Sequence, residues 1–220
     1  HIVTPVHKRI DYCSEEKMDQ KIGTTCRGIG PTYVDKYNRC GIRALDLHDI
    51  KKLRQKVMDR LALAINTGEL SDSDRADLIP EIEKFLKDSA KIFPMVKDTF
   101  SMLHEMVDNN KNILLEGAQG TMLDVNHGTY PFVTSSSPSS GGISTGLGLP
   151  LTKVNRIVGI FKAYTTRVGK GPFPTELLDS DGEKLRDLGK EYGATTDRPR
   201  RCGWFDAVEA RYSVQINGFT

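Results

Sequence analysis

One long polar stretch constrains this chain more than any other feature. It runs from Glu116 to Thr134, continues to the glycines at 141–148, and consists largely of Gly, Ser, Thr, Asn, Asp and His. The apolar run 112–115 (Asn-Ile-Leu-Leu) leads directly into it. A short buried strand that ends in a glycine-rich polar loop is the usual layout of a ligand site in an open α/β sheet. We therefore expect the chemistry of this chain at 116–148.

A second apolar run, at 156–164, predicts another buried strand, and a basic glycine-rich loop follows it at 165–174. Helical patterns are expected near 181–191 and at 204–215. Apolar runs that alternate with helical patterns are typical of an α/β fold. The sequence thus predicts a mostly parallel sheet with flanking helices.

Residues 48–108 predict a helical insertion into that fold. Its first helix ends at 66–68 and carries an apolar stripe with a four-residue spacing, formed by Leu53, Val57, Leu61 and Ile65. A second helix is expected from 71–74 through Leu86, with an interruption near Pro80. A third is expected from about Met95 to Val107, where His104 fits a helix-face residue better than a ligand.

The first 45 residues show little periodic pattern. At 23–31, three glycines, two threonines and one arginine suit an oxyanion such as phosphate, although a plain Gly/Pro turn fits the same composition. Residues 32–39 predict two helical turns. There Arg39 follows Asp35 by four residues, the spacing of an ordinary surface pair.

The composition excludes several classes of protein. With 38% hydrophobic and 27% charged residues, the chain of 220 residues fits a globular protein, and its net charge of +2 does not favour nucleic-acid or membrane partners. No apolar segment approaches the roughly 20 residues of a membrane span, and the first residues do not form a signal peptide. The four cysteines lack metal-ligand spacing and fit free thiols, on which ground we expect a cytoplasmic protein.

Four loops share one chemical character: 23–31, 116–148, 165–172 and 193–203 combine Gly with Thr or Ser. Loops that leave the carboxyl ends of parallel strands converge on one crevice. Convergence would gather five arginines around an anionic ligand, namely Arg27, Arg167, Arg198, Arg200 and Arg201. Gln119 can donate to a carbonyl and accept from a ring N–H, which suits a base edge.

Other functions remain open at this point. The run 198–201 also fits a solvated basic patch or a nucleic-acid contact, against which the near-neutral charge argues. The chain contains no Gly-x-x-x-x-Gly-Lys-Ser/Thr loop and no Gly-x-Ser-x-Gly motif. The residues alone therefore predict an anionic small-molecule site on an α/β sheet.

Several sequence blocks together resemble one family. They are Gly23-Thr-Thr-Cys-Arg-Gly-Ile-Gly-Pro31, Glu116-Gly-Ala-Gln-Gly-Thr121, Asp124-x-x-His-Gly-Thr-Tyr-Pro131, Val133-Thr-Ser-Ser136, Lys162-Ala-Tyr-Thr-Thr-Arg-Val-Gly-x-Gly-Pro-Phe-Pro-Thr-Glu176, and Gly193-Ala-Thr-Thr-x-Arg198 with Arg201-x-Gly-Trp204. In this order they resemble adenylosuccinate synthetase. The agreement of separate blocks is far more specific than any one of them.

The resemblance implies a P-loop-NTPase-like α/β fold and a GTP- and Mg²⁺-dependent ligase of purine biosynthesis. Such an enzyme phosphorylates the 6-oxygen of IMP, and the amino group of L-aspartate then displaces the phosphate to form adenylosuccinate. Phosphoryl transfer requires charge neutralisation and positioning more than covalent chemistry, which the loops suit.

The resemblance also assigns roles to individual residues. For IMP it implies Thr25 and Thr134 at the 5′-phosphate, Gln119 near the purine 6-position, Arg198, and Arg39 reaching the site of the neighbouring subunit of a homodimer. For aspartate it implies the loop of Ala194, Thr195, Thr196, Asp197, Arg198, Pro199 and Arg200. Arg200 would also approach the GTP phosphates, and Val168 would pack on the nucleotide.

The chain departs from the family pattern at two cysteines and lacks several segments. Cys26 stands where glycine is commoner and would crowd a tight turn, and Cys40 stands where a basic or small residue is usual. The family's N-terminal phosphate loop with its catalytic aspartate, the catalytic histidine and the guanine-recognition segment are not in these 220 residues. We therefore expect one domain, 1–220, incomplete at both ends and inactive by itself.

In that case Gln119 has only a supporting role, and the catalytic residues and Mg²⁺ ligands lie elsewhere. The alternative function is a catalytically inactive module that binds purine nucleotides.

Overall fold

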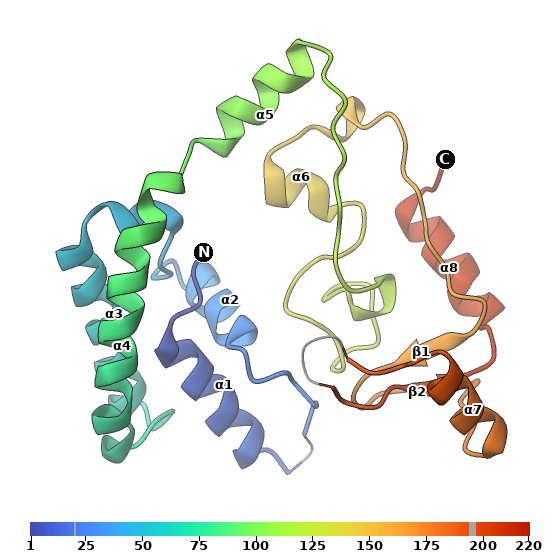
Figure 1. Cartoon of the computed structure of the whole chain (residues 1–220), viewed down its shortest axis with the longest axis horizontal. Coiled ribbons are helices and arrows are strands. Elements are labelled where there is room, and N and C mark those ends of the chain that lie inside the picture. The colour runs from blue at the N-terminus through green and yellow to red at the C-terminus, as the bar shows by residue number, and fades with distance from the viewer. Residues whose placement is uncertain (20, 194–196) are drawn as a thin grey trace. The chain divides into compact units, whose positions relative to one another are not determined.

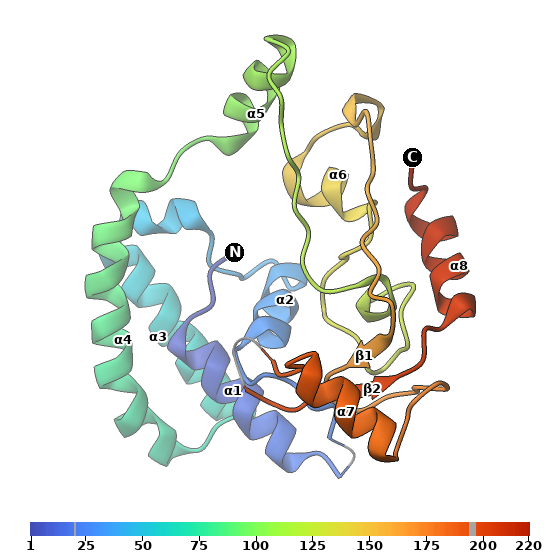
Figure 2. The same cartoon turned by 45° about the vertical axis from the view of Figure 1, so that its right-hand side comes forward.

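The computed structural model describes residues 1–19, 21–193 and 197–220. The chain divides into two compact units, His1–Asp98 and Thr99–Thr220. Figures 1 and 2 show the elements of both units from two directions. None of the described helices has the length and apolar character needed to cross a membrane.

The first unit is helical. Its elements in chain order are α1 (Pro5–Lys17), α2 (Ile29–Tyr37), the 3-10 turn η1 (Ala44–His48), α3 (Ile50–Asn66), α4 (Asp72–Ile92) and the 3-10 turn η2 (Phe93–Met95). Helices α3 and α4 lie side by side, and α1 packs against α2, α3 and α4 (Figure 2). The predicted helices of residues 50–92 and the helical turns after Pro31 are therefore confirmed.

The predicted stripe of α3 forms the centre of this unit. Leu53, Val57 and Leu61 are fully buried, and Leu78 and Ile82 of α4 are fully buried against the same cluster. Burying apolar side chains contributes about 25 cal/mol per Å² of area removed from water. The helical pairing of α3 and α4 follows from these two stripes.

Helix α1 was missed by the sequence patterns, and its burial explains why. It begins with a capping box at Thr4 and with Pro5 in the first turn. Its buried positions include His7, Asp11 and Glu15. Because polar residues occupy much of the buried face, no apolar stripe marks the helix.

The expected interruption of α4 at Pro80 is wrong. Proline removes one backbone N–H donor from a helix, yet α4 continues from Asp72 to Ile92 without a break. Leu78 and Ile82, on either side of Pro80, are completely buried. Tertiary packing of this face therefore outweighs the local preference of proline.

The second unit combines short helices with long extended segments. Its elements in chain order are α5 (Thr99–Asp108), η3 (Thr121–Leu123), α6 (Gly142–Leu147), η4 (Leu151–Lys153), β1 (Thr165–Arg167), α7 (Ser180–Leu188), β2 (Arg201–Gly203) and α8 (Ala207–Asn217). The predicted helices near 181–191 and 204–215 are confirmed as α7 and α8. The predicted third helix begins later than expected, as α5.

The described residues do not form the expected parallel sheet. Their one sheet pairs β1 with β2 in antiparallel register, with Thr166 opposite Cys202. The predicted strands at 112–115 and 156–164 are drawn as extended chain without a strand ladder (Figure 1). A strand exists only where a neighbour completes its ladder of backbone hydrogen bonds. Among the described residues only Thr220 does this in part, because its N donates to Ile157 O at 3.0 Å and its Oγ1 accepts from Ile157 N at 3.1 Å.

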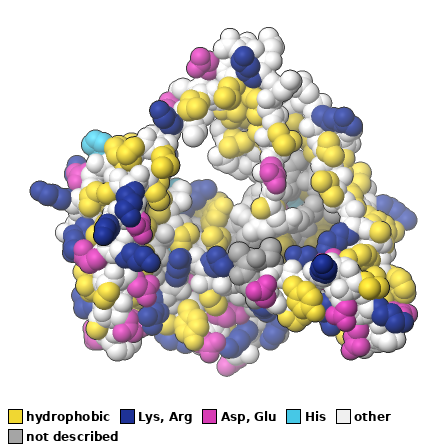
Figure 3. Space-filling model, in the orientation of Figure 1, with side chains coloured by type: hydrophobic (Ala, Val, Ile, Leu, Met, Phe, Trp, Pro, Cys, Tyr) yellow, Lys and Arg dark blue, Asp and Glu magenta, His cyan; other side chains and the backbone are white. Residues whose placement is uncertain are grey.

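These two segments also expose apolar side chains. Leu114 is 89% exposed, Val158 67% and Ile160 94%. Figure 3 shows hydrophobic side chains interspersed among charged ones on one face of the molecule. Large apolar side chains in a row at a surface indicate contact with something outside these residues.

Candidate functional site

Asp124 organises the long polar loop of the second unit. Its fully buried carboxylate accepts hydrogen bonds through Oδ2 from Ser139 Oγ at 2.7 Å and through Oδ1 from Asn126 N at 2.9 Å. Burial opposes ionisation, yet these bonds outweigh it and lower the pKa of Asp124. One carboxylate thereby holds residues 126–139 in a compact loop.

The loop brings two predicted IMP residues into direct contact. Gln119 Nε2 donates to Thr134 Oγ1 at 3.3 Å, and Ser136 Oγ donates to Gln119 Oε1 at 3.3 Å. The backbone supports this arrangement, because Thr134 N donates to Leu123 O at 2.8 Å. The contact joins residues fifteen positions apart in the chain.

Gln119 is exposed and has a left-handed backbone with φ of +70°. Non-glycine residues rarely adopt this conformation, and it recurs at ligand sites where the surroundings enforce it. The side-chain amide of Gln119 is therefore presented at the surface of the loop, next to two hydroxyl groups.

Arg167 on β1 contacts the same loop. Its Nη2 donates to Thr129 Oγ1 at 2.9 Å and to Phe132 O at 3.0 Å. Burial and the nearby charge of Arg201 lower the pKa of Arg167. Arg167 thus ties the polar loop to the sheet, although the sequence predicted that it would face an anion.

Arg201 on β2 also has a structural partner. Its guanidinium forms a two-pronged ion pair with Glu176, and its Nη1 donates to Gly171 O at 2.9 Å. The bond to Arg201 is the main reason that the pKa of Glu176 is lowered. Arg201 therefore anchors the loop at 169–171 to the sheet.

Arg200, next along the chain, meets a buried carboxylate. Its Nη1 donates to Glu191 Oε2 at 2.7 Å, and Glu191 also accepts from Lys162 Nζ at 2.7 Å and from Tyr164 Oη at 2.6 Å. Burial opposes ionisation of Glu191, but these donors outweigh it and lower the pKa of Glu191 to about 2. Two basic groups therefore share one anion, one from the predicted strand 156–164 and one from the predicted loop 193–203.

The residues that flank the predicted aspartate loop are paired with each other next to this carboxylate. Tyr192 and Pro199 form an antiparallel bridge, and Gly193 N donates to Arg198 O at 2.9 Å. Asp197 has a left-handed backbone and is exposed. Ala194, Thr195 and Thr196 lie outside the described residues.

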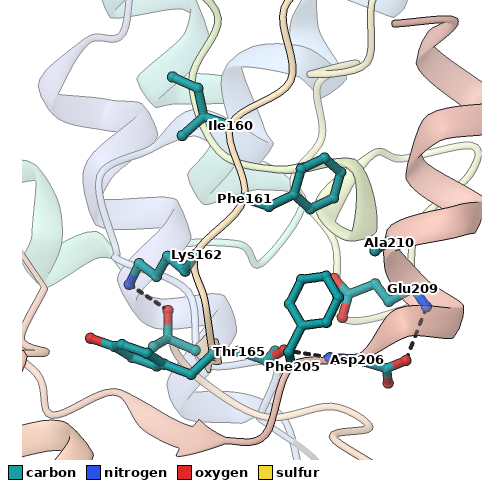
Figure 4. Close-up of a pocket in the computed structure, with 10 residues that line it drawn as sticks. Ile160, Phe161, Lys162, Thr165, Phe205, Asp206, Glu209 and Ala210 are labelled. Carbon is teal, nitrogen blue, oxygen red and sulfur yellow. Dashed lines mark hydrogen bonds between the residues drawn. The ribbon is translucent and has the colours of Figure 1, made fainter.

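A cavity of about 210 Å³ lies elsewhere in the second unit (Figure 4). Phe161, Lys162, Phe205 and Glu209 line it, and burial raises the pKa of Glu209. Of the predicted substrate-binding residues that the structure describes, none lines this cavity. Val168 is 38% exposed and does not line it either.

In the first unit, two carboxylates of α1 shape the predicted phosphate loop at 23–28. Asp11 Oδ2 accepts from Gly28 N at 2.8 Å, and Glu15 Oε1 accepts from Gly23 N at 2.5 Å. Gly28 has φ of +79°, and a Cβ there would lie 2.8 Å from Lys8 N, so only glycine fits. Thr25 is exposed at the tip of the loop.

Cys26 adopts a left-handed backbone with φ of +51° within this loop. Its Sγ lies 3.6 Å from Thr24 Oγ1. The tight turn expected at this position is present, and the cysteine occupies it in a conformation that favours glycine. Cys40 is exposed, and its Sγ lies 3.6 Å from Asp35 O.

Arg39 follows α2 in a left-handed conformation, φ +64°, and is exposed. The expected surface pair between Arg39 and Asp35 is wrong. Asp35 is buried and instead pairs with Arg60 Nε at 2.8 Å and with His7 Nε2 at 2.9 Å. Arg39 has no side-chain hydrogen bond or ion pair with the described residues, which leaves its guanidinium available to a partner.

The structure therefore brings some predicted residues together and separates others. Gln119 and Thr134 are in contact, and Arg198 and Arg200 lie on one hairpin, whereas Thr25, Arg27 and Arg39 belong to the first unit. Sequence reasoning missed the organising carboxylates Asp11, Asp124 and Glu191. Asp124 lies within one of the glycine-rich loops and Glu191 lies just before another, whereas nothing near Asp11 in the sequence marks it.

The described residues contain no group of three or more His, Cys, Asp or Glu side chains that could hold a metal ion. The carboxylates at the loops are instead committed to backbone N–H, hydroxyl and basic groups. These residues therefore do not fit a Mg²⁺ site by themselves.

Comparisons with known proteins agree on one family. A family model described as adenylosuccinate synthetase matches residues 1–220. The adenylosuccinate synthetase of Streptomyces coelicolor is 52% identical over 224 residues, with 100% of this chain and 52% of that protein covered. That of Bifidobacterium animalis subsp. lactis is 50% identical over 222 residues, with the same coverage of 100% and 52%.

A solved structure described as fully ligated adenylosuccinate synthetase from Plasmodium falciparum superposes with a TM-score of 0.91 at 39% identity. The match covers 100% of this chain and 52% of that one. The chain thus spans about half the length of the relatives it matches. By its sequence and its fold together, the chain belongs to the adenylosuccinate synthetase family.

Proposed function

We propose that the protein containing this chain ligates IMP and L-aspartate to adenylosuccinate with GTP as co-substrate, in purine nucleotide biosynthesis. The match of the whole chain to the family carries this proposal. In the first step the 6-oxygen of IMP attacks the γ-phosphorus of GTP, and GDP leaves. In the second, the amino group of aspartate attacks C6, the C–O bond breaks, phosphate leaves and the amino group loses a proton.

This chain contributes the IMP-binding loops. The contact between Gln119 and Thr134 places both residues assigned to IMP in one loop, Gln119 for the purine 6-position and Thr134 for the 5′-phosphate. The hydrogen-bonded loop around Asp124 supports these assignments further. Polar groups that are fixed before the substrate binds stabilise developing charge without reorganisation. Thr25, Arg39 and Arg198 complete the set assigned to IMP.

The hairpin above Glu191 contributes the aspartate site. Its residues are Ala194, Thr195, Thr196, Asp197, Arg198, Pro199 and Arg200. The short backbone bridge at its base and the basic side chains on its arm support this assignment, since arginine pairs with carboxylates in a forked geometry. Arg200 also reaches the GTP phosphates, and Val168 packs on the nucleotide.

The remaining half of the family's length supplies the rest of the machinery. Mg²⁺, when it is bound, would neutralise phosphate charge. Its ligands would lie beyond the described residues. The exposed apolar side chains of 158–160 and Leu114 support inner strands of a mostly parallel, P-loop-NTPase-like sheet. Residues 1–220 are then part of a single domain.

The protein acts as a homodimer in this proposal, in which Arg39 reaches the site of the neighbouring subunit. The exposed, unengaged guanidinium of Arg39 after α2 supports that role. The four free cysteines support a cytoplasmic location.

The activity is tested with the full-length protein encoded by the parent gene. Purified protein should form adenylosuccinate only when IMP, aspartate, GTP and Mg²⁺ are all present. Binding of IMP without turnover would favour the inactive nucleotide-binding module instead. A parent gene without a phosphate loop upstream of His1 would rule out the ligase.

Sharing of the site is tested by complementation between variants. Arg39→Leu should weaken the use of IMP and leave the fold intact, and Arg198→Leu should lose activity separately. Mixed, the two variants should recover part of the activity, because a hybrid dimer contains one site with both arginines. Mixtures that stay as inactive as their components would contradict the role of Arg39 across the interface.

A further inference from the structure

The carboxylate of Glu191 is a buried anion of the second unit that is held by side chains. Glu191 is 4% exposed and accepts from three different side chains, those of Lys162, Tyr164 and Arg200. Lys162 is in turn positioned by Thr166, whose Oγ1 accepts from Nζ at 2.8 Å. Figure 4 shows the Lys162 side chain pointing away from the rings of Phe161 and Phe205.

Glu191 also contacts Arg200 through its backbone. Arg200 N donates to Glu191 O at 2.9 Å, so the main chain and the side chain of the two residues are paired together. This double contact lies next to the antiparallel bridge between Tyr192 and Pro199, which forms the base of the hairpin. A shift of Glu191 would therefore move the base of the hairpin and the guanidinium of Arg200 at once.

The contact engages only one side of the Arg200 guanidinium. Nη1 is held by Glu191, while Nε and Nη2 have no hydrogen bond to a described residue, and the side chain is 28% exposed. A guanidinium presents its donors in a rigid planar fork, so fixing one nitrogen fixes the direction of the others. The free donors are thus aimed in one direction before a ligand arrives.

We propose that Glu191 is a positioning residue of the ligase reaction, which holds Arg200 ready to bind the anionic groups of aspartate and GTP. This inference rests on the proposed function of the chain. Without Glu191, Arg200 would have to lose its rotational freedom on binding, and the affinity for the two anions would fall.

Tyr164 and Lys162 give the carboxylate its own fixed orientation. The phenol donates at 2.6 Å and the ammonium at 2.7 and 2.8 Å, which prevents the carboxylate from following Arg200 when that side chain moves. A carboxylate needed only to neutralise Lys162 would not require the contact with Arg200. Neutralising Lys162 and positioning Arg200 predict different kinetics for a variant of Glu191.

The test is Glu191→Gln in the full-length protein, with steady-state kinetics for all three substrates. Glutamine keeps the size of the side chain but loses the charge that orients two basic groups. The KM for aspartate and for GTP should rise on the order of 10- to 100-fold, because charge-assisted bonds are the stronger class. The KM for IMP and the kcat should change by less than about threefold.

Asp187→Asn is the matched control. It removes an exposed carboxylate of the same unit, near the same hairpin, whose side chain accepts from Tyr192 Oη but does not contact Arg200. Its kinetic constants should equal those of the wild type. A comparable loss in Asp187→Asn would overturn the inference, because a general loss of negative charge would then explain the effect.

Coupling between the two residues is tested by a double variant. If Glu191 acts through Arg200, Glu191→Gln should add little to the aspartate KM of Arg200→Gln. Fully additive effects would show that Glu191 acts elsewhere. Equal changes in kcat and in all three KM values, with a lower melting temperature, would show a purely structural role.

Tyr164→Phe keeps the inference testable if Glu191→Gln does not fold. It removes only one donor to Glu191 and should raise the aspartate KM by about 2- to 10-fold, with unchanged IMP KM. An aspartate KM equal to that of the wild type would overturn the inference. If the wild-type protein itself forms no adenylosuccinate, the proposed function fails first, and the two failures are thereby distinguished.

Discussion

Single carboxylates set the conformation of the loops in this chain. Asp11 binds the backbone of the 23–28 loop, Asp124 binds that of the 126–139 loop, and Glu191 binds the base of the 193–198 hairpin. A buried carboxylate accepts several hydrogen bonds at once, so one residue can fix the conformation of a loop that contains no helix or strand. In each case an acidic side chain orders a loop assigned to anionic substrates.

The pKa of Glu191 leads to a prediction at this scale. Its folded pKa of about 2 lies below the ordinary 4.5, so the stabilisation is present above about pH 4.5 and is lost as the pH falls towards 2. A shift of this size corresponds to the order of 3 kcal/mol. The free energy of unfolding of the wild type should therefore approach that of Glu191→Gln on acidification.

Chemical denaturation between pH 7 and pH 3 measures this difference. The gap between wild type and Glu191→Gln should be largest near neutral pH and should shrink below about pH 4.5. Asp187→Asn serves again as the control, since its gap should be small throughout. A gap for Glu191→Gln that is independent of pH would contradict the assignment.

At the scale of elements, packing and capping compete with local propensity. Helix α1 forms on a polar buried face because its capping box and proline define the start. Helix α4 tolerates Pro80 because its apolar face is buried on both sides of that residue. The antiparallel pair β1 and β2 forms where the sequence predicted loops, because the two segments pair through their backbones. Arg167 and Arg201 on these strands also bind neighbouring loop oxygens.

Pro80→Ala tests the conclusion that packing of α4 outweighs the local cost of proline. Alanine restores the backbone donor of an exposed helix position and should raise the free energy of unfolding by about 1–3 kcal/mol. The increase is below the full helix-propensity difference because alanine also frees the unfolded chain. Glu81→Ala, at the next exposed position, should change the stability by less than about 0.5 kcal/mol. Equal effects of the two substitutions would show that α4 carries no strain at Pro80.

At the scale of the whole chain, the two units differ in how they bury apolar residues. The first has a continuous core of side chains from α1, α3 and α4. In the second, the buried hydrophobic residues among those described are Leu149 and Cys202, whereas Val158 and Ile160 are largely exposed. Burial against the other half of the family's length would account for this difference.

Hydrogen exchange tests that account. In residues 1–220 alone, the amides of 113–116 and 158–161 should exchange rapidly, because no described acceptor holds them. In the full-length protein the same amides should be slowed by several orders of magnitude if they join a parallel sheet. Amides of the buried face of α3 should be slow in both. Rapid exchange of 158–161 in the full-length protein would exclude a central strand there.

The sequence by itself determined the presence of the helices α3 and α4 and the family, and it predicted which loops would bind ligands. These depend on local periodicity and on the order of short motifs, which are properties of neighbouring residues. The partners of the arginines depended on tertiary structure: Arg167, Arg200 and Arg201 each bind oxygens that lie far away in the chain or across a hairpin.

The same holds for the pairing of Gln119 with Thr134 and for the missing parallel sheet. A side chain selects its partner by distance and burial in the folded chain, and a strand exists only beside a neighbour that completes its hydrogen bonds. The sequence therefore predicted which loops would bind anions. The tertiary structure decided that Arg200 and Arg201 pair with Glu191 and Glu176, whereas the guanidinium of Arg39 has no partner among the described residues.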